Sequence, residues 1–357
     1  MKDLRSAYLR LDVARKMESD ATLLTSHLLI LQAMTDELPM QRIRFYTQKF
    51  FDKEFPSRAV VSIAEKVEGV QLGVVATVSD GQGPTRFFVK THSGGSLASR
   101  KSSGLEPVLP EELLCYRILE LLGLGCKFYF FGRDEKNLYL CTRDASADGE
   151  YIEYANLLGK DSDKLEEIIG SALKINMEAA KDPETSTIEI DAPRDNDSRD
   201  FLQSMLALAM IEWLLNLHDL QSNEGNFGFV RKSGLGWKLC IIDFGAHSIQ
   251  PMRSRSNGAH LFQTGLSASF CDVYRTCALL RRSTDAKMAD GRALLAGLLS
   301  DFVDVVALAA KHVSEDFTEF VLKHTSDDQV DRILQGIEKA SSAYIENFQA
   351  MSDFLGS

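Results

Sequence analysis

Polar side chains gather where two apolar segments of the chain end. The first segment, Leu214–Val230, has the sequence LLNLHDLQSNEGNFGFV, and the second, Lys238–Ser248, has the sequence KLCIIDFGAHS. The side chains concerned are Asp219, Asn223, Asn226 and Asp243. Polar groups at the ends of core strands are costly to bury, so they usually lie where something is bound. The pattern therefore predicts a binding site assembled from both segments.

The composition indicates a globular protein that is not specialised for nucleic acids. The chain has 357 residues, of which 45% are hydrophobic and 25% charged, and this length is sufficient for two lobes. Its formal net charge is -11, whereas a dedicated nucleic-acid-binding surface needs clustered Lys and Arg. The six cysteines show no CxxC spacing, which favours reduced, buried thiols over a structural zinc site.

No stretch of the sequence has the pattern of a targeting or membrane segment. The N-terminal sequence MKDLRSAYLRLDVARK lacks the continuous apolar stretch of a secretory signal. The longest apolar run, FLQSMLALAMIEWLLNL, is interrupted by polar residues and is too broken to span a bilayer. We therefore expect no transmembrane segment and a cytoplasmic location, and entry into the nucleus stays open.

The elements that must position the polar residues change character along the chain. Residues 1–55 have apolar residues at helical spacing and predict helices. Residues 59–92 are β-branched and interrupted by glycines, which predicts at least three antiparallel strands, the last ending on Lys90. Pro110, followed by two glutamates, begins a predicted helix that ends at glycines. Two strand-like runs, CKFYFFG and NLYLCTRDA, follow, and from about residue 151 the pattern predicts a mainly helical lobe with a short strand pair.

Four pieces of this pattern occur in one order. A strand ends on Lys90 in FFVK, and the next helix carries Glu112 in EELLCYR. A polar loop from Asp219 to Asn226 follows a long helix, and a later strand ends on Asp243 in IIDFG. This order resembles the protein-kinase-like superfamily, in which a strand lysine, a helix glutamate, a catalytic loop and a metal-binding Asp-Phe-Gly follow one another.

The resemblance covers roughly residues 58–250 and favours one branch of the superfamily. The segments EELLCYRILELLGLG and GNFGF are similar to the phosphoinositide-kinase-like and bacterial persistence-toxin kinases. In that branch the helix glutamate stands four residues before an aromatic or Met position, which favours Glu112 over Glu111.

The resemblance implies binding of ATP with Mg²⁺ and transfer of the γ-phosphoryl group to a hydroxyl. Lys90 would contact the phosphates, and Glu112 would hold Lys90 in an ion pair. Asn226 and Asp243 offer oxygen ligands that suit Mg²⁺, and Asp219 would orient or deprotonate the acceptor hydroxyl. The interpretation requires Lys90 and Glu112 to lie within ion-pair reach of each other and near Asp243.

Two features depart from the superfamily pattern. The catalytic Asp usually precedes the metal-binding Asn by five residues, but the residue five before Asn226 is Gln221. Either a longer loop still lets Asp219 reach the site, or Gln221 occupies the base position and the enzyme is impaired; Asn223 is a further candidate. The expected G-x-G-x-x-G turn is also incomplete, because KVEGVQLGVV contains only two glycines. These candidate phosphate-binding glycines are Gly69 and Gly73.

We therefore predict an α+β, two-lobed protein-kinase-like fold. A small antiparallel-sheet N-lobe with one key helix spans residues 56–145, a mainly helical C-lobe residues 146–357, and an N-terminal helical extension residues 1–55. The first functional interpretation is an ATP-Mg²⁺ phosphotransferase whose acceptor is a protein, a lipid headgroup or a small molecule. The alternatives are a pseudokinase that serves as a binding scaffold, and an unrelated α+β protein whose motifs match by chance.

Overall fold

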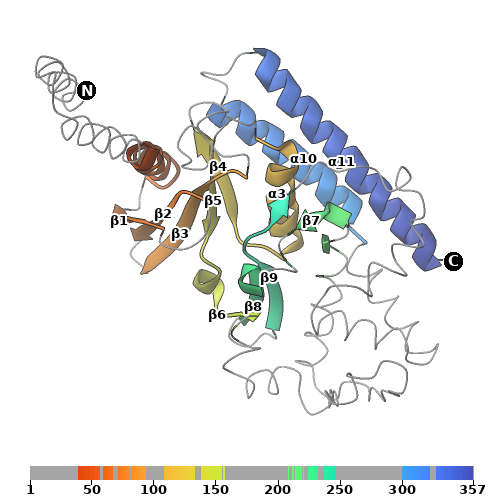
Figure 1. Cartoon of the computed structure of the whole chain (residues 1–357), viewed down its shortest axis with the longest axis horizontal. Helices are drawn as coiled ribbons and strands as arrows, with labels where there is room; N and C mark the ends of the chain where they lie inside the picture. Colours follow the sequence, from red (N-terminus) through yellow and green to blue (C-terminus); the bar gives the residue numbers. More distant parts are fainter. Residues whose placement is uncertain are drawn as a thin grey trace, which may run out of the picture.

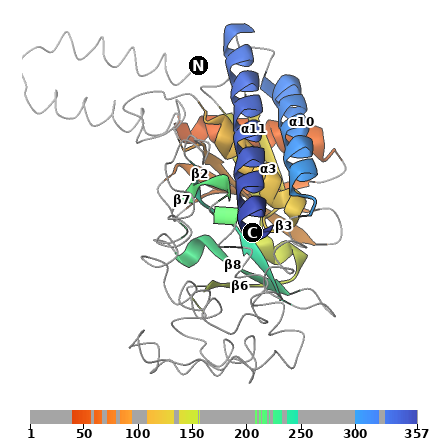
Figure 2. The ribbon, with the colours of Figure 1, turned by 90° about the vertical axis from the view of Figure 1, so that its right-hand side faces the viewer.

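The computed structural model of the chain has an α+β architecture, with sheets at its centre and long helices beside them (Figures 1 and 2). It describes residues 39–56, 59–66, 71–79, 83–93, 108–132, 138–154, 156, 208, 211–212, 214–218, 220, 224–231, 237–246, 300–321 and 327–356.

Five strands form the larger sheet. They are β1 (Ala59–Glu65), β2 (Gly73–Ser79), β3 (Pro84–Thr91), β4 (Phe128–Gly132) and β5 (Leu138–Arg143). Their order in the sheet is β1-β2-β3-β5-β4, and every neighbouring pair is antiparallel. The prediction of antiparallel strands before and after the Pro110 helix is confirmed. Strand β3 continues one residue beyond the predicted end at Lys90, because Thr91 still pairs with Tyr139.

The two faces of this sheet pack against different helices, since successive side chains of a strand point to opposite faces. Phe131 and Tyr139 join the cluster that the helix of residues 39–54 covers, whereas their neighbours Phe130 and Leu140 join the main core. On the first face, aromatic rings from the helix stack directly on the strands, and the centroids of Phe50 and Phe131 are 4.3 Å apart.

Helix α3 (Pro110–Leu122) lies on the second face of the sheet, as the sequence predicted. Proline at the first turn and the two acidic residues after it suit a helix N-terminus. The helix ends at Gly123, whose φ of 65° is a left-handed conformation that a side chain would strain. Glu112 to Leu119 are eight consecutive buried residues, so partners cover the helix on every side.

The later part of the chain adds two smaller sheets, where we expected a helical lobe with a short strand pair. Strands β6 (Glu150–Glu153), β8 (Phe227–Arg231) and β9 (Trp237–Ile241) form an antiparallel sheet in the order β6-β8-β9. Strands β7 (Leu217–His218) and β10 (Gly245–Ala246) form a second pair. Short 3₁₀ turns, η2 (Ala145–Asp148) and η4 (Glu224–Asn226), precede β6 and β8.

The chain ends in a C-terminal helix pair, α10 (Phe302–Val321) and α11 (Asp327–Gly356). We expected these helices in the C-lobe, but both pack against α3, and α10 also contacts β4 (Figures 1 and 2). Their buried stripes, at helical spacing, join the same core as α3. The members of the stripes are Phe302, Val306, Ala309, Val313, Phe317, Val330, Ile333, Ile337, Ala340 and Tyr344.

Polar contacts add to the apolar packing between α3 and the C-terminal helix pair. The buried Arg117 guanidinium donates to Glu120 at 2.5 Å and to Asp316 of α10 at 2.6 Å. The Cys115 thiol lies 3.1 Å from the Tyr344 hydroxyl of α11. A buried charge needs such partners, so these contacts specify which face of α3 meets the pair.

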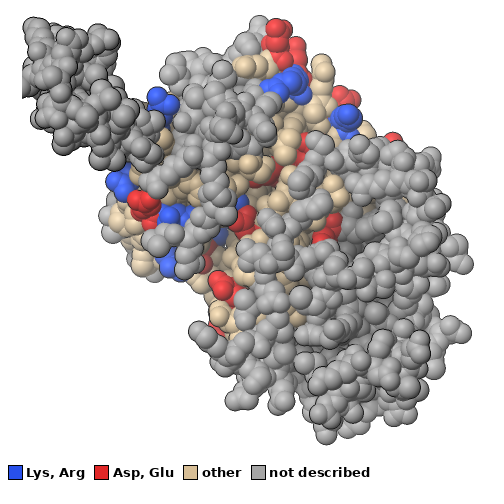
Figure 3. All heavy atoms as spheres, viewed as in Figure 1, with Lys and Arg blue, Asp and Glu red and all other residues tan. Residues whose placement is uncertain are grey.

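Basic and acidic side chains are mixed on the surface of the described residues. On the face in Figure 3, Lys and Arg are interspersed with Asp and Glu.

Among the described helices, none combines the length and the apolar character needed to cross a bilayer.

The contact between α11 and α3 can be tested at Gly336. Alanine at a helix interior position is normally more stable than glycine by about 1 kcal/mol. A Cβ at position 336, however, would lie 2.5 Å from Cγ of the rigid Pro110 ring. We therefore expect Gly336→Ala to lower the free energy of unfolding by about 1–3 kcal/mol, measured by denaturant titration.

Ser342→Ala is the matched control, because Ser342 lies on an exposed part of the same helix. It should leave the stability unchanged or slightly raised, as helix propensity alone requires. A stabilising Gly336→Ala would contradict the close packing of α11 on α3.

Candidate functional site

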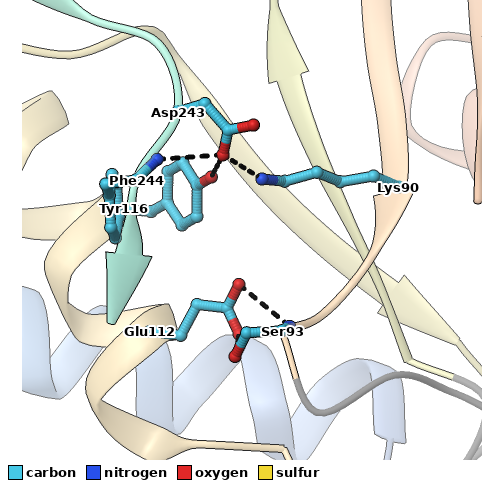
Figure 4. A network of polar contacts seen from close by, with 6 residues as sticks. All are labelled: Lys90, Ser93, Glu112, Tyr116, Asp243 and Phe244. Atoms are coloured by element: carbon cyan, nitrogen blue, oxygen red, sulfur yellow. Dashed lines mark hydrogen bonds and ion pairs between the residues drawn. The ribbon is translucent and has the colours of Figure 1, made fainter. Parts of the chain in front are cut away.

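Lys90 and Asp243, 153 residues apart in sequence, form an ion pair (Figure 4). Lys90 lies in β3, where pairing with both β2 and β5 fixes its position. Asp243 lies two residues after β9, and both its amide and that of Ile242 donate to the carbonyl oxygen of Asn226, at 3.1 and 2.9 Å. Lys90, the backbone of Asn226 and Asp243 therefore lie close together.

One oxygen of the Asp243 carboxylate receives all of its hydrogen bonds. Oδ1 accepts from the Lys90 ammonium, from the Tyr116 hydroxyl at 3.2 Å and from the Phe244 amide at 2.9 Å. In the part of the chain that the structure describes, Oδ2 accepts no hydrogen bond, and the side chain is 39% exposed. Burial opposes ionisation, but the charge and hydrogen bond of Lys90, the charge of Lys66 and the Phe244 amide outweigh it and lower the pKa of Asp243.

Tyr116 connects α3 to Asp243, and we did not predict its role. Its ring stacks on Phe128 at 4.8 Å between centroids and contacts Phe244 at 4.3 Å. Burial, together with the Asp243 charge, raises the pKa of Tyr116 well above its usual range, so the hydroxyl stays a donor. The sequence contained a signal, an aromatic residue four positions after Glu112, but we used it only to choose the glutamate.

Glu112 does not form the expected ion pair with Lys90. Its buried carboxylate instead accepts from the Ser93 amide, with Oε2 at 2.9 Å, and from the Ser93 hydroxyl at 2.7 Å (Figure 4). Burial raises the pKa of Glu112, and the Lys90 charge and the Ser93 hydrogen bonds only partly oppose this effect. The kinase-like interpretation set two conditions. Lys90 does lie beside Asp243, but it does not form the required ion pair with Glu112.

The physical reason lies in competition for one ammonium group. Asp243 and Glu112 both approach Lys90, and the closer pair in this structure is Lys90 with Asp243. Ser93, three residues after Lys90, offers Glu112 two neutral donors in place of a cation. No feature of the sequence marked Ser93, which begins the Ser/Gly-rich stretch SGGSLASRKSSG.

Of the remaining candidate residues, the structure describes only Gly73. Gly73 in β2 pairs with Lys90, and a Cβ there would lie 2.6 Å from the carbonyl oxygen of Val89. Close strand packing therefore requires glycine at this position, independently of any phosphate. The other candidate positions, Asp219, Gly69, Gln221 and Asn223, lie outside the described residues.

The donor set fits the phosphate-bound type of magnesium site better than a site made of protein ligands alone. Among the described residues no group of three or more His, Cys, Asp or Glu side chains lies close enough to hold a metal ion. Mg²⁺ usually takes one or two carboxylates, retains waters and binds phosphate oxygens. Oδ2 of Asp243 offers one such carboxylate oxygen, and Asn226 lies next to Asp243 through the two backbone hydrogen bonds.

Comparisons with known proteins add a weak structural likeness. No protein-family model and no curated protein matches the chain. Among solved structures, the chain matches the Helicobacter pylori proinflammatory kinase CtkA at 12% identity, with a TM-score of 0.37, over 81% of this chain and 96% of that chain. A likeness of this strength does not by itself establish a fold or an activity.

The partner of Glu112 can be tested by its effect on pH-dependent stability. A carboxyl group whose pKa rises on folding stabilises the protein most at low pH, and this contribution declines as the pH rises above its ordinary value of 4.5. Glu112→Gln keeps an acceptor for Ser93 and removes the buried charge. The Tm of Glu112→Gln minus that of the unsubstituted protein should therefore become more positive between about pH 4 and pH 8.

Glu111→Gln is the matched control, since Glu111 lies in the same turn and is only half-buried. Its Tm difference should vary little over that range. If Glu112 were paired with Lys90, its pKa would be lowered, and the Glu112→Gln difference would become more negative as the pH rises.

Proposed function

We propose that this chain is a kinase-like protein that binds ATP with Mg²⁺ beside Lys90, Asn226 and Asp243 and transfers the γ-phosphoryl group to a hydroxyl. The observation that carries the proposal is the ion pair between the lysine of β3 and the carboxylate after β9. Phosphoryl transfer needs a cation on the nucleotide phosphates and a carboxylate that holds the metal, so the two groups must belong to one site.

Lys90 would be the group that contacts the phosphates. Its side chain is only 8% exposed, and Asp243 compensates the charge that burial would otherwise penalise. Two neighbouring strands hold its backbone, so little conformational entropy remains to be lost when the ammonium binds an anion.

Asp243 and Asn226 would hold the metal, whose contribution is to neutralise charge on the transferred phosphoryl group. Tyr116 and the Phe244 amide fix the Asp243 carboxylate through Oδ1, which leaves Oδ2 to bind a cation. The lowered pKa of Asp243 keeps this ligand ionised at neutral pH.

The acceptor hydroxyl belongs to a protein, a lipid headgroup or a small molecule, and the base that orients it is Asp219. The proposal for Asp219 rests on the resemblance of HDL to the start of kinase catalytic loops. Gln221 is the alternative at this position, and it would leave the protein without a base.

One observation favours a second candidate, a catalytically impaired pseudokinase. Glu112 accepts hydrogen bonds from Ser93 in place of the Lys90 ammonium, and burial raises its pKa. Lys90 therefore stays with Asp243 and is less available to phosphates. Such a protein would bind ligands or partners through the same fold without phosphoryl transfer.

Nucleotide binding is the first test. ATP with Mg²⁺ should raise the Tm, because saturation at one hundred times Kd stabilises the folded state by about 2.7 kcal/mol. Asp243→Asn, which preserves the side-chain size, and Asp243→Ala should both abolish the part of the shift that depends on Mg²⁺. Asp304→Ala, at an exposed position of α10, is the control and should keep the whole shift.

No Tm shift with any nucleotide, with or without Mg²⁺, would contradict the phosphotransferase and an ATP-binding pseudokinase alike. If binding occurs, incubation with radiolabelled ATP and mixed acceptors separates the two candidates. Asp219→Ala should abolish transfer while nucleotide binding persists, and Gln221→Asp should not increase transfer. Transfer that survives in Asp219→Ala would show that another residue acts as the base.

A further inference from the structure

Two buried cysteines that the proposed function does not use lie next to each other. Cys126 lies in the connection between α3 and β4, and Cys240 lies in β9. Their sulfur atoms are 3.6 Å apart, and the two residues are 9% and 6% exposed. They pack with the buried Ala145 and the partly buried Ile242, directly before Asp243.

The surrounding backbone holds the two thiols in this position. The Ile241 amide donates to the Leu124 carbonyl at 2.8 Å, and Gly125 and Ile241 form a parallel bridge. The residues that flank each cysteine are therefore already paired across the contact. A disulfide has a sulfur–sulfur distance of about 2.05 Å, so its formation requires the two atoms to approach by roughly 1.5 Å.

We propose that Cys126 and Cys240 are an oxidative modification site at which a peroxide forms an intramolecular disulfide. One thiolate attacks the peroxide and breaks the O–O bond, which yields a sulfenic acid and one water molecule from H₂O₂. The second thiol attacks this sulfur, the S–O bond breaks, and a second water leaves. In sum, two thiols lose two protons and two electrons, and one H₂O₂ is reduced to two H₂O.

Two other buried cysteines differ from this pair and serve as internal references. Cys115 and Cys141 are both 0% exposed. Burial raises the pKa of Cys115 to about 12, and burial also raises the pKa of Cys141. The thiolate is the reactive form, so we expect these two thiols to stay reduced under mild oxidation.

The disulfide would fasten the α3–β4 connection to the strand that leads to Asp243. It joins positions 114 residues apart, so it restricts the unfolded chain strongly. It also strengthens a contact that the backbone already makes. The oxidised protein should therefore be more stable, and the amides of Ile241 and Ile242 should exchange more slowly with deuterium.

The test is treatment of the purified protein with a small excess of H₂O₂, followed by alkylation and tryptic digestion without reductant. Each of the six cysteines falls on a different tryptic peptide. The expected product is residues 118–127 linked to residues 239–253, lighter than the two peptides together by two hydrogen atoms. The Tm of the oxidised protein should rise by several degrees and return to its starting value after reduction with dithiothreitol.

Cys126→Ser and Cys240→Ser should each abolish the linked peptide and the Tm rise, and Cys141→Ser should keep both. Sulfinic acid or unlinked products at the two positions, or a link between other cysteines, would overturn the proposal. These readouts involve neither ATP nor Mg²⁺, so they stand whether or not the chain is a kinase.

Discussion

Burial of helix α3 on every side is the constraint on which the rest of the structure depends. A surface helix exposes one stripe, whereas eight consecutive residues of α3, from Glu112 to Leu119, are buried. The sheet covers one side through Phe128 and Phe130, and the C-terminal helix pair covers another. Because α3 carries both Glu112 and Tyr116, its packing determines where a carboxylate and a phenol meet the ends of β3 and β9.

A second consequence of this burial is that two carboxylates share the neighbourhood of one lysine. Lys90 forms its ion pair with Asp243, whose pKa is lowered, and Glu112 is left with neutral donors and a raised pKa. A buried charge that lacks an opposite charge is costly, so the pKa is raised in the carboxyl that is not paired with Lys90. The partner of Lys90 also separates the two functional candidates. In the phosphotransferase Lys90 must be able to leave Asp243 and bind phosphate, whereas in the pseudokinase it stays with Asp243.

The C-terminal helix pair gives the far end of the chain a direct effect on the site. Asp316 binds Arg117, one residue after Tyr116, and Tyr344 contacts Cys115, one residue before it. Residues separated by about 200 positions in sequence therefore brace the helix segment that orients Asp243. This arrangement couples the stability of the last helices to the geometry of the candidate site through α3.

The sequence by itself determined the local elements and the order of the motifs. Proline and two glutamates located the start of α3, glycine located its end, and β-branched runs located the strands, because these signals act within a few residues. The order of Lys90, Glu112 and Asp243 also predicted that the lysine and the aspartate would meet. Only the tertiary structure decided that Lys90 binds Asp243 rather than Glu112. Asp243 comes from a distant part of the sequence and pairs with the Lys90 ammonium, and Ser93 supplies the hydrogen bonds to Glu112. It also decided that α10 and α11 cover α3 and that Cys126 meets Cys240, since an apolar stripe shows which face is buried but not what buries it.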